Sequence, residues 1–364
     1  MRRRGITRRQ FIMQRLLLIL GILVLLVVII AVASKIVTLL GKNRLKGNAN
    51  TQGPVLEENV AETNEAKVKY ASDWQDGWIS YKGQVYAYND DIRTFLILGI
   101  DPAHQGGDEK FDELTDGGQS DGIYLMILNP RDESIRVLAV NRDTEAEIVM
   151  VGIGEGGTDI VAKSQITNQH GFGGGKEYSC ELTRDAVSKL LYNVPIHGYA
   201  AINYKAIPKI NDAVGGVQVT LNQDYSDLDK SWTEGTTLTF HGEEAYKFIK
   251  YRDTNVFESQ RMRLGRQKLY LTSLIKQAKS KTRDDIILPI SMYNSLKDYM
   301  VTDLTVDKVG YMASEYINYD FDGENIYTME GETVLEDDGY EHFYPDEDAL
   351  KDMIIELYYE PVER

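Results

Sequence analysis

Phe95-Leu96-Ile97-Leu98-Gly99-Ile100-Asp101 is a continuous apolar run that ends in a carboxylate. An uninterrupted run of this kind is typical of a strand that is buried on both faces of a sheet. Asp101 would then lie at the carboxyl end of the strand, where open α/β sheets bind their ligands. We therefore expect Asp101 to be a site residue.

The rest of the chain alternates strand patterns with helix patterns. Further strands are expected at 123–128, 135–140, 196–203 and 217–221, and helices at 181–192, 204–214, 242–250 and from 262 to about 279. A hairpin is expected over 74–88. This alternation predicts an α/β fold with a mainly parallel or mixed central sheet and helices on both faces. The glycine-rich stretch 152–157 is interpreted as a loop, because no amphipathic helix follows it, as a dinucleotide site would require.

The N-terminus has the pattern of a membrane anchor. Leu16–Ala33 runs 18 residues without a polar side chain, which is close to the length that crosses a bilayer. Six arginines precede it, and the positive-inside rule places them in the cytoplasm. The rest of the chain would then be extracytoplasmic. A signal peptide cleaved after Ala31-Val32-Ala33 is the alternative.

The predicted organisation has five parts. They are a basic cytoplasmic tail (1–15), one transmembrane helix (16–40), a polar extracytoplasmic stalk (41–73), a catalytic domain (74–280) and an acidic C-terminal extension (281–364). The extension is expected to pack on the same domain, with a separate small module as the alternative, and it shows no catalytic constellation. A single cysteine, Cys180, excludes an internal disulfide. The five histidines have no zinc-ligand spacing.

Residues 247–268, KFIKYRDTNVFESQRMRLGRQK, form a basic island with seven positive and two negative side chains. The first 46 residues hold ten Lys and Arg and no acid, so the chain beyond them carries −26 of charge. Such a body repels nucleic acid, and arginines retained within it are suited to clamping a compact anion. Helical spacing places Arg263, Arg266 and Gln267 on one face. A solvated charged face is the alternative.

Carboxylates and arginines from separate segments together have the composition of a phosphoryl-transfer site. The carboxylates are Asp101 and Asp121 at strand edges, and the arginines are Arg142, Arg252, Arg263 and Arg266. Two carboxylates can hold Mg²⁺ or Mn²⁺ beside phosphate oxygens, and arginines offset the charge on those oxygens. The alternatives are that Asp101 is an ordinary turn residue and that Arg142 and Asp143 form a local ion pair.

Seven motifs in order resemble the LytR-CpsA-Psr family over residues 91–280. They are LILGID (96–101), SDGIYLMILNP (120–130), VNRDT (140–144), the glycine-rich 165–174, INDAVGGVQV (210–219), FIKYRD (248–253) and RLGRQ (263–267). The resemblance implies a membrane-anchored phosphotransferase of mainly Gram-positive walls. Such an enzyme moves an anionic glycopolymer, of the teichoic acid or capsule type, from a polyprenyl-pyrophosphate carrier to peptidoglycan. It also implies an apolar tunnel for the polyprenyl tail.

By motif, the resemblance implies that Asp101 and Asp121 are the Mg²⁺-linked carboxylates. The implied pyrophosphate-binding set is Arg142, Arg252, Arg263, Arg266 and Gln267. The chain departs from the family pattern at four positions. The family usually has Arg where this chain has Ala103, Gln119 and Lys250, and Lys where this chain has Gln165. Lys is not equivalent to Arg at a bidentate site. Two alternatives therefore stay open, a catalytically weak lipid-linked-glycan binder or scaffold, and a polyprenyl-pyrophosphate hydrolase.

Overall fold

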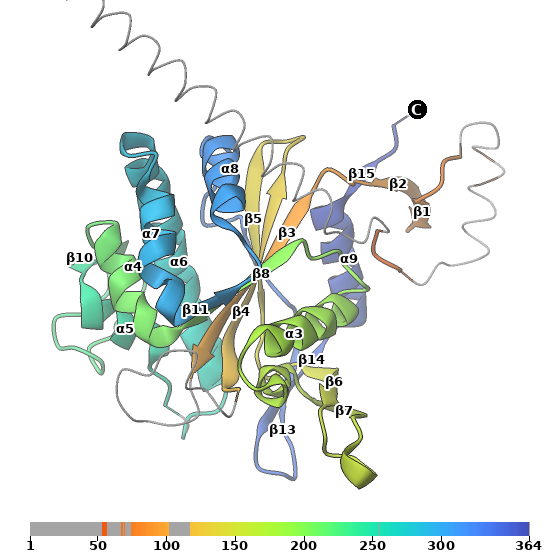
Figure 1. Cartoon of the computed structure of the whole chain (residues 1–364), viewed down its shortest axis with the longest axis horizontal. Coiled ribbons are helices and arrows are strands. Elements are labelled where there is room, and N and C mark those ends of the chain that lie inside the picture. The colour runs from red at the N-terminus through yellow and green to blue at the C-terminus, as the bar shows by residue number, and fades with distance from the viewer. Residues whose placement is uncertain are drawn as a thin grey trace, which may run out of the picture.

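A computed structural model describes residues 53–56, 67, 69, 74–101, 117–253 and 255–363. Its largest sheet has the strand order β11-β8-β3-β4-β5-β12 (Figure 1). Central strand β3 (Arg93–Asp101) pairs antiparallel with β4 (Gln119–Asn129) and parallel with β8 (Gly198–Asn203). β5 (Ser134–Val140) runs antiparallel to β4 and parallel to β12 (Ile326–Thr328), and β11 (Met300–Thr302) is antiparallel to β8.

The central sheet contains both parallel and antiparallel pairs, so of the two expected forms it is the mixed one. One antiparallel pair follows from a short connection. A short turn joins β4 to β5, and strands joined by so short a connection must run antiparallel. The expected strands 95–101, 123–128, 135–140 and 196–203 are all present, with ends that differ by a few residues.

Helices cover both faces of this sheet, as expected. Leu96 and Leu98 of β3 pack with α3 (Glu177–Leu190) and α9 (Glu347–Tyr358). Phe95, whose side chain points to the other face, packs with Tyr311 of α8 (Val306–Tyr316). Figure 1 shows α3 and α9 on one side of the sheet and α6, α7 and α8 on the other.

The basic island lies in a lobe on the α6 side of the sheet. The lobe contains α4 (Ile207–Ala213), α5 (Gly242–Lys250), α6 (Ser259–Asp284), α7 (Leu288–Leu296) and the two-stranded sheet of β9 (Val217–Thr220) and β10 (Thr237–Phe240). Its core includes Trp232, Phe240 and Phe248. The strand expected at 217–221 is present, but it pairs with β10 and not with the central sheet.

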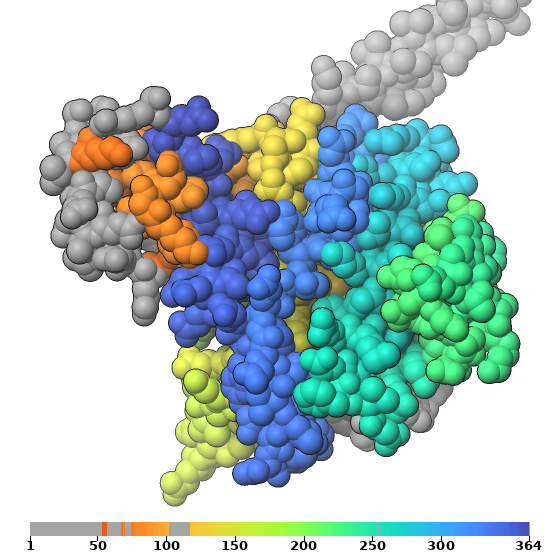
Figure 2. Space-filling model, turned by 180° about the vertical axis from the view of Figure 1, so that it is seen from behind, coloured from red at the N-terminus to blue at the C-terminus, as the bar shows by residue number. Residues whose placement is uncertain are grey.

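The remaining strands form small sheets around the core. The expected hairpin of β1 (Trp78–Tyr81) and β2 (Gln84–Tyr88) is present, and β15 (Tyr359–Pro361) pairs with β2. β6 (Glu145–Met150) pairs with β7 (Ile160–Gln165), and β13 (Gly331–Leu335) with β14 (Glu341–Pro345). A 3-10 helix, Ile166–Gly173, follows β7. Seen from behind, the last part of the chain lies between β1–β2 and the α5–α6 lobe (Figure 2).

The predicted anchor at 16–40, most of the stalk at 41–73 and residues 102–116 lie outside the described residues. Among the residues that are described, no helix has both the length and the apolar character needed to cross a membrane.

Candidate active site

Asp121 is the centre of a buried charged cluster formed by three segments of the chain. It lies in β4 close to the irregularity at Gly99 and Ile100, where the register between β3 and β4 shifts. Its Oδ2 is 3.3 Å from Nη1 of Arg263 on α6, and its Oδ1 accepts a hydrogen bond from Arg142, which follows β5. Asp121 and Arg263 are almost fully buried. The strand edge and the basic helix therefore meet at this carboxylate.

Several donors of this cluster point into the site without a partner. Nε and Nη2 of Arg263 and the hydroxyl of Tyr204 are among the buried atoms that have no hydrogen-bond partner in the described part of the structure. Buried polar groups are nearly always paired, so unpaired guanidinium donors indicate a place for an acceptor-rich ligand. Burial and the nearby Asp121 raise the pKa of Tyr204 well above its usual value, so its hydroxyl stays protonated and can donate.

Tyr204 lies against glycines of the two central strands. A Cβ on Gly99 would be 2.9 Å from the Tyr204 ring, and one on Gly122 would be 3.1 Å from its hydroxyl oxygen. Real Cβ atoms are rarely so close to other atoms, and only glycine permits such a close approach. The glycine in LILGID is therefore needed for the position of Tyr204.

Asp143 is a second buried carboxylate of the cluster and contacts two of its arginines. Its Oδ1 is 3.1 Å from Nε of Arg142, and its Oδ2 is 3.8 Å from Nη2 of Arg252. Burial raises the pKa of Asp143 although both arginines oppose the shift. The alternative of a local Arg142–Asp143 ion pair is thus present together with the contact between Arg142 and Asp121. The ion pair with Asp143 orients Arg142 toward Asp121.

Glu341 brings the C-terminal extension into the site, which the sequence did not indicate. Its Oε2 is 3.3 Å from Nη2 of Arg252, and its Oε1 accepts the backbone N–H of Glu258 at 2.9 Å. The segment 281–364 thus adds a carboxylate to the surroundings of Arg252, although the sequence shows no catalytic constellation in it. No local pattern relates residue 341 to residue 252, because the two meet only when β14 packs beside the start of α6.

Asp101 and Lys250 form a second pair at the same sheet edge. Oδ1 of Asp101 is 3.0 Å from Nζ of Lys250, which also donates to the hydroxyl of Tyr246 at 2.9 Å. Burial alone would lower the pKa of Lys250, but the hydrogen bonds with Tyr246 and Asp101 raise it above its usual value. Lys250 therefore keeps its charge, although it lacks the fork of an arginine.

Asp101 and Asp121 are the two predicted metal-binding carboxylates, and in the structure both are paired with cationic side chains. In the register of β3 and β4, Asp101 is paired with Gln119, which is two residues before Asp121. Asp101 and Asp121 therefore lie at the same end of this strand pair. Among the described residues, no group of three His, Cys, Asp or Glu side chains could hold a metal ion alone. Mg²⁺ commonly takes one or two carboxylates and completes its shell with water and phosphate oxygens. The donor set fits such an ion.

The other predicted ligands have different surroundings. Gln119 accepts from Nη2 of Arg142 at 3.1 Å and so lies within the cluster. Gln165 instead donates to the backbone carbonyl of Glu341 at 2.7 Å. Its amide therefore fixes β14 and is not free to bind an anion.

Arg266 and Gln267, two members of the expected pyrophosphate-binding set, both contact backbone carbonyls. Both are buried on the predicted face of α6, but Arg266 donates to the backbone carbonyls of Phe248, at 3.0 Å, and Tyr251. Gln267 donates to the carbonyl of Ile249 at 3.3 Å and accepts from Tyr124. These contacts satisfy carbonyls at the end of α5, which its last turn leaves without intrahelical partners. Both side chains hold α5 against α6.

An apolar cavity of about 140 Å³ begins beside the cluster, between the sheet and α6. Ile97 and Gly99 of β3 line one wall, and Leu271 and Leu274 of α6 line the opposite wall. Tyr204 lines both this cavity and the polar cluster, since its hydroxyl lies by Gly122 near Asp121. A ligand with an anionic head and an apolar tail would fit here, with its head at the charged cluster and its tail in the apolar cavity.

The fold and this site belong to a known class. The LytR_cpsA_psr family model matches residues 50–357, and the chain belongs to that family. The chain is 29% identical over 267 residues to the polyisoprenyl-teichoic acid–peptidoglycan teichoic acid transferase TagU of Bacillus cereus, covering 72% of this chain and 77% of that protein. TagU of Enterococcus faecalis is 28% identical over 243 residues, covering 65% and 70%.

Solved structures share the fold. The crystal structure of B. subtilis TagV superposes with a TM-score of 0.54 at 21% identity, covering 73% of this chain and 96% of TagV. The structure of TagT bound to LI-WTA gives a TM-score of 0.53 at 20% identity, covering 73% and 89%. Family membership thus agrees with the resemblance in the seven motifs.

Proposed function

We propose that this protein transfers an anionic glycopolymer of the teichoic acid type from a polyprenyl-pyrophosphate carrier to peptidoglycan. The observation that carries the proposal is the buried Arg263, which has two donors without a partner among the described residues and lies near Tyr204, a residue that also lines the apolar cavity. A pyrophosphate supplies acceptors for these donors, and a prenyl chain supplies apolar surface for the cavity. The names of the relatives, which are teichoic acid transferases, support the same substrate class.

The residues of the cluster would bind and orient the pyrophosphate. Arg263 and Tyr204 donate to its oxygens, while Asp121 and Asp143 hold the guanidinium of Arg142 toward the same place. Donors that are fixed before the reaction stabilise the charge that develops on a transferring phosphoryl group. Mg²⁺ or Mn²⁺ would be held by Asp101 and Asp121, and when bound it would neutralise part of the pyrophosphate charge.

In the proposed transfer, a sugar hydroxyl of peptidoglycan attacks the phosphorus that carries the glycopolymer. A bond forms between that phosphorus and the hydroxyl oxygen, and the bond from that phosphorus to the bridging oxygen breaks. Polyprenyl phosphate leaves with the bridging oxygen, and the hydroxyl proton passes to one carboxylate of Asp101 and Asp121. Asp121 lies beside the arginines that would hold the pyrophosphate, and Asp101 lies beside Lys250, which suits either carboxylate to this role.

The substituted motif positions support activity more than a scaffold role. Lys250 still places a positive charge at Asp101, and Gln119 still contacts Arg142. The proposal places this domain outside the cell, held to the membrane by residues 16–40, as the sequence predicts.

The test is an assay of the full chain in detergent micelles with a polyprenyl-pyrophosphate-linked glycopolymer and peptidoglycan oligomers, with and without Mg²⁺. Wild type should form a conjugate in the presence of Mg²⁺, and Arg142→Ala should not. Arg184→Ala is the matched control, because Arg184 is paired with the neighbouring exposed Asp185 far from the site. Lipid binding without turnover would indicate a scaffold, and release of a glycan phosphate without a conjugate would indicate a hydrolase.

A further inference from the structure

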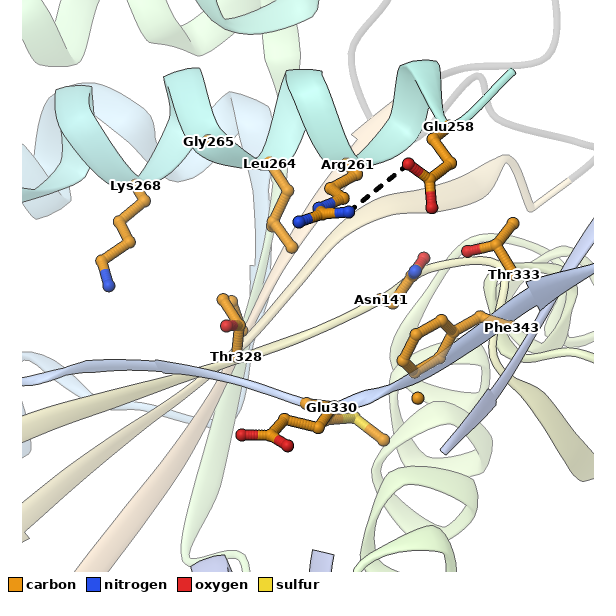
Figure 3. Close-up of a pocket in the computed structure, with 13 residues that line it drawn as sticks. Asn141, Glu258, Arg261, Leu264, Gly265, Lys268, Thr328, Glu330, Thr333 and Phe343 are labelled. Atoms are coloured by element: carbon orange, nitrogen blue, oxygen red, sulfur yellow. Dashed lines mark hydrogen bonds and ion pairs between the residues drawn. The ribbon is translucent and has the colours of Figure 1, made fainter. Parts of the chain in front are cut away.

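A polar groove lies on the flank of α6 that faces away from the apolar cavity. It has a volume of about 580 Å³ and separates α6 from the segment between β12 and β13. Arg261, Leu264, Gly265 and Lys268 form its helix wall, at the spacing of one helical stripe. Figure 3 shows Leu264 and Lys268 reaching from α6 toward the strand and Thr328 pointing back toward the helix. In Figure 2, the blue C-terminal residues and the teal residues of α6 lie on either side of a hollow.

The groove adjoins the reaction site. Asn141, which lines it, directly precedes Arg142 in the chain. Glu258 also lines it, and the backbone N–H of Glu258 is bound to Glu341, the partner of Arg252. The charged cluster therefore lies between two cavities, with the apolar one on one flank of α6 and the polar one on the other. A chain lying in the groove would end beside the donors of Arg142.

The lining of the groove has no net charge. Arg261 and Lys268 are balanced by Glu258 and Glu330. Arg261 is 3.4 Å from the carboxylate of Glu258, and Lys268 donates to the backbone carbonyl of Ile326 at 2.8 Å. These cations are therefore partly satisfied, which makes them weaker attractors for a phosphate than Arg263, whose Nε and Nη2 are buried and have no partner in the described part of the chain.

Neutral polar groups and an apolar base complete the lining. Thr328, Thr333 and Asn141 offer hydroxyl and amide groups, and Leu264 and Phe343 offer apolar surface. The turn between β13 and β14 carries Glu336, Asp337 and Asp338, which add negative charge to the hairpin whose Thr333 and Phe343 line the groove and so disfavour a polyphosphate. Convergent neutral donors and acceptors beside apolar carbons suit sugar rings, which present hydroxyl and acetamido groups around an apolar face.

We propose that this groove binds the acceptor, an uncharged oligosaccharide with hydroxyl and acetamido groups, and presents one of its hydroxyls to the phosphorus at the Arg263 site. The inference rests on the proposed transferase function and adds the place where the acceptor lies. It assigns the two flanks of α6 to the two substrates, with the lipid tail of the donor on one side and the acceptor sugar on the other.

The test fills the groove without touching the anion site. A Cβ on Gly265 would meet no heavy atom within 4 Å, so α6 can carry a side chain there, and Gly265→Trp should block the groove. Ser280→Trp, at an exposed position of the same helix, is the matched control. Thr328→Val is a second, isosteric variant that removes one hydroxyl from the wall. Binding to the full chain is measured by calorimetry with N-acetylchitotetraose, a glycerol-phosphate oligomer and geranylgeranyl pyrophosphate as probes.

Wild type should bind the tetrasaccharide, and Gly265→Trp should raise its Kd at least tenfold while the Kd for geranylgeranyl pyrophosphate stays unchanged. Thr328→Val should raise the tetrasaccharide Kd several-fold, and Ser280→Trp should change neither Kd. The proposal is overturned if wild type does not bind the tetrasaccharide or if Gly265→Trp binds it equally well. It is also overturned if Gly265→Trp weakens only the glycerol-phosphate oligomer, since the groove would then hold the donor polymer. Failure of wild type to bind geranylgeranyl pyrophosphate would instead refute the proposed function.

Discussion

Arg263 and Arg266 lie three residues apart on the same buried face of α6, yet the structure predicts opposite consequences of removing them. Arg263 has two donors without partners, whereas Arg266 donates to the backbone carbonyls of Phe248 and Tyr251. We expect Arg263→Met to weaken ligand binding strongly and to lower stability less than Arg266→Met, because Asp121 keeps its hydrogen bond from Arg142 when its pair with Arg263 is lost. We expect Arg266→Met to lower stability and to affect binding only through the packing of α5. Met keeps much of the buried stem in both variants.

The magnitudes follow from the contacts of each guanidinium. A charge-assisted hydrogen bond contributes about 1.5–3 kcal/mol, so the two free donors of Arg263 account for about 3–6 kcal/mol of binding. That loss corresponds to a 10²- to 10⁴-fold weaker Kd, at about 1.4 kcal/mol for each factor of ten. In Arg266→Met, the buried carbonyl of Phe248 loses its donor at about 1–3 kcal/mol and the partly buried carbonyl of Tyr251 loses less, so the free energy of unfolding should fall by about 2–4 kcal/mol.

Two measurements separate the roles. Calorimetric titration with geranylgeranyl pyrophosphate gives the Kd, and urea denaturation followed by tryptophan fluorescence gives the free energy of unfolding. The reasoning would be refuted if Arg263→Met bound the pyrophosphate as tightly as wild type. It would also be refuted if Arg263→Met were as unstable as Arg266→Met, because Arg263 would then serve the packing and not the ligand.

Three further predictions follow from neighbouring contacts. Glu341→Gln should lower transfer about tenfold by freeing Arg252, and it should have no further effect in an Arg252→Ala background, which a double-mutant cycle measures. Tyr204→Phe should weaken pyrophosphate binding about tenfold without loss of stability, because the removed hydroxyl has no hydrogen-bond partner among the residues that the structure describes; a fall in the urea midpoint would contradict this. Burial alone would lower the pKa of His342, but hydrogen bonds to Glu145 and Asp338 raise it. Its contribution to stability is therefore complete below pH of about 6.5, the unfolded value, and is lost as pH rises through the higher folded pKa. Between pH 6 and 9, wild type should lose about 1 kcal/mol more than His342→Gln, and equal losses would exclude this role.

The sequence alone determined four strands of the central sheet, the helices of the basic island and the family, because these depend on local patterns. The apolar run before Asp101 indicates a strand that is buried on both faces. The spacing of Arg263, Arg266 and Gln267 indicates one face of a helix. Both patterns repeat with the period of the backbone, so they can be read without knowing what lies opposite. Part of the mixed direction of the sheet followed from the short connection between β4 and β5, which the sequence also contains.

Only the tertiary structure decided which side chains are free to bind a ligand. Arg263 and Arg266 are equivalent by spacing, but the carbonyls at the end of α5 lie within reach of one and not of the other. Glu341 became part of the site because β14 packs against the start of α6, 89 residues away from Arg252 in the chain. A hydrogen bond is formed or missing according to distances of a few ångströms between separate elements, and no periodicity in the sequence encodes those distances.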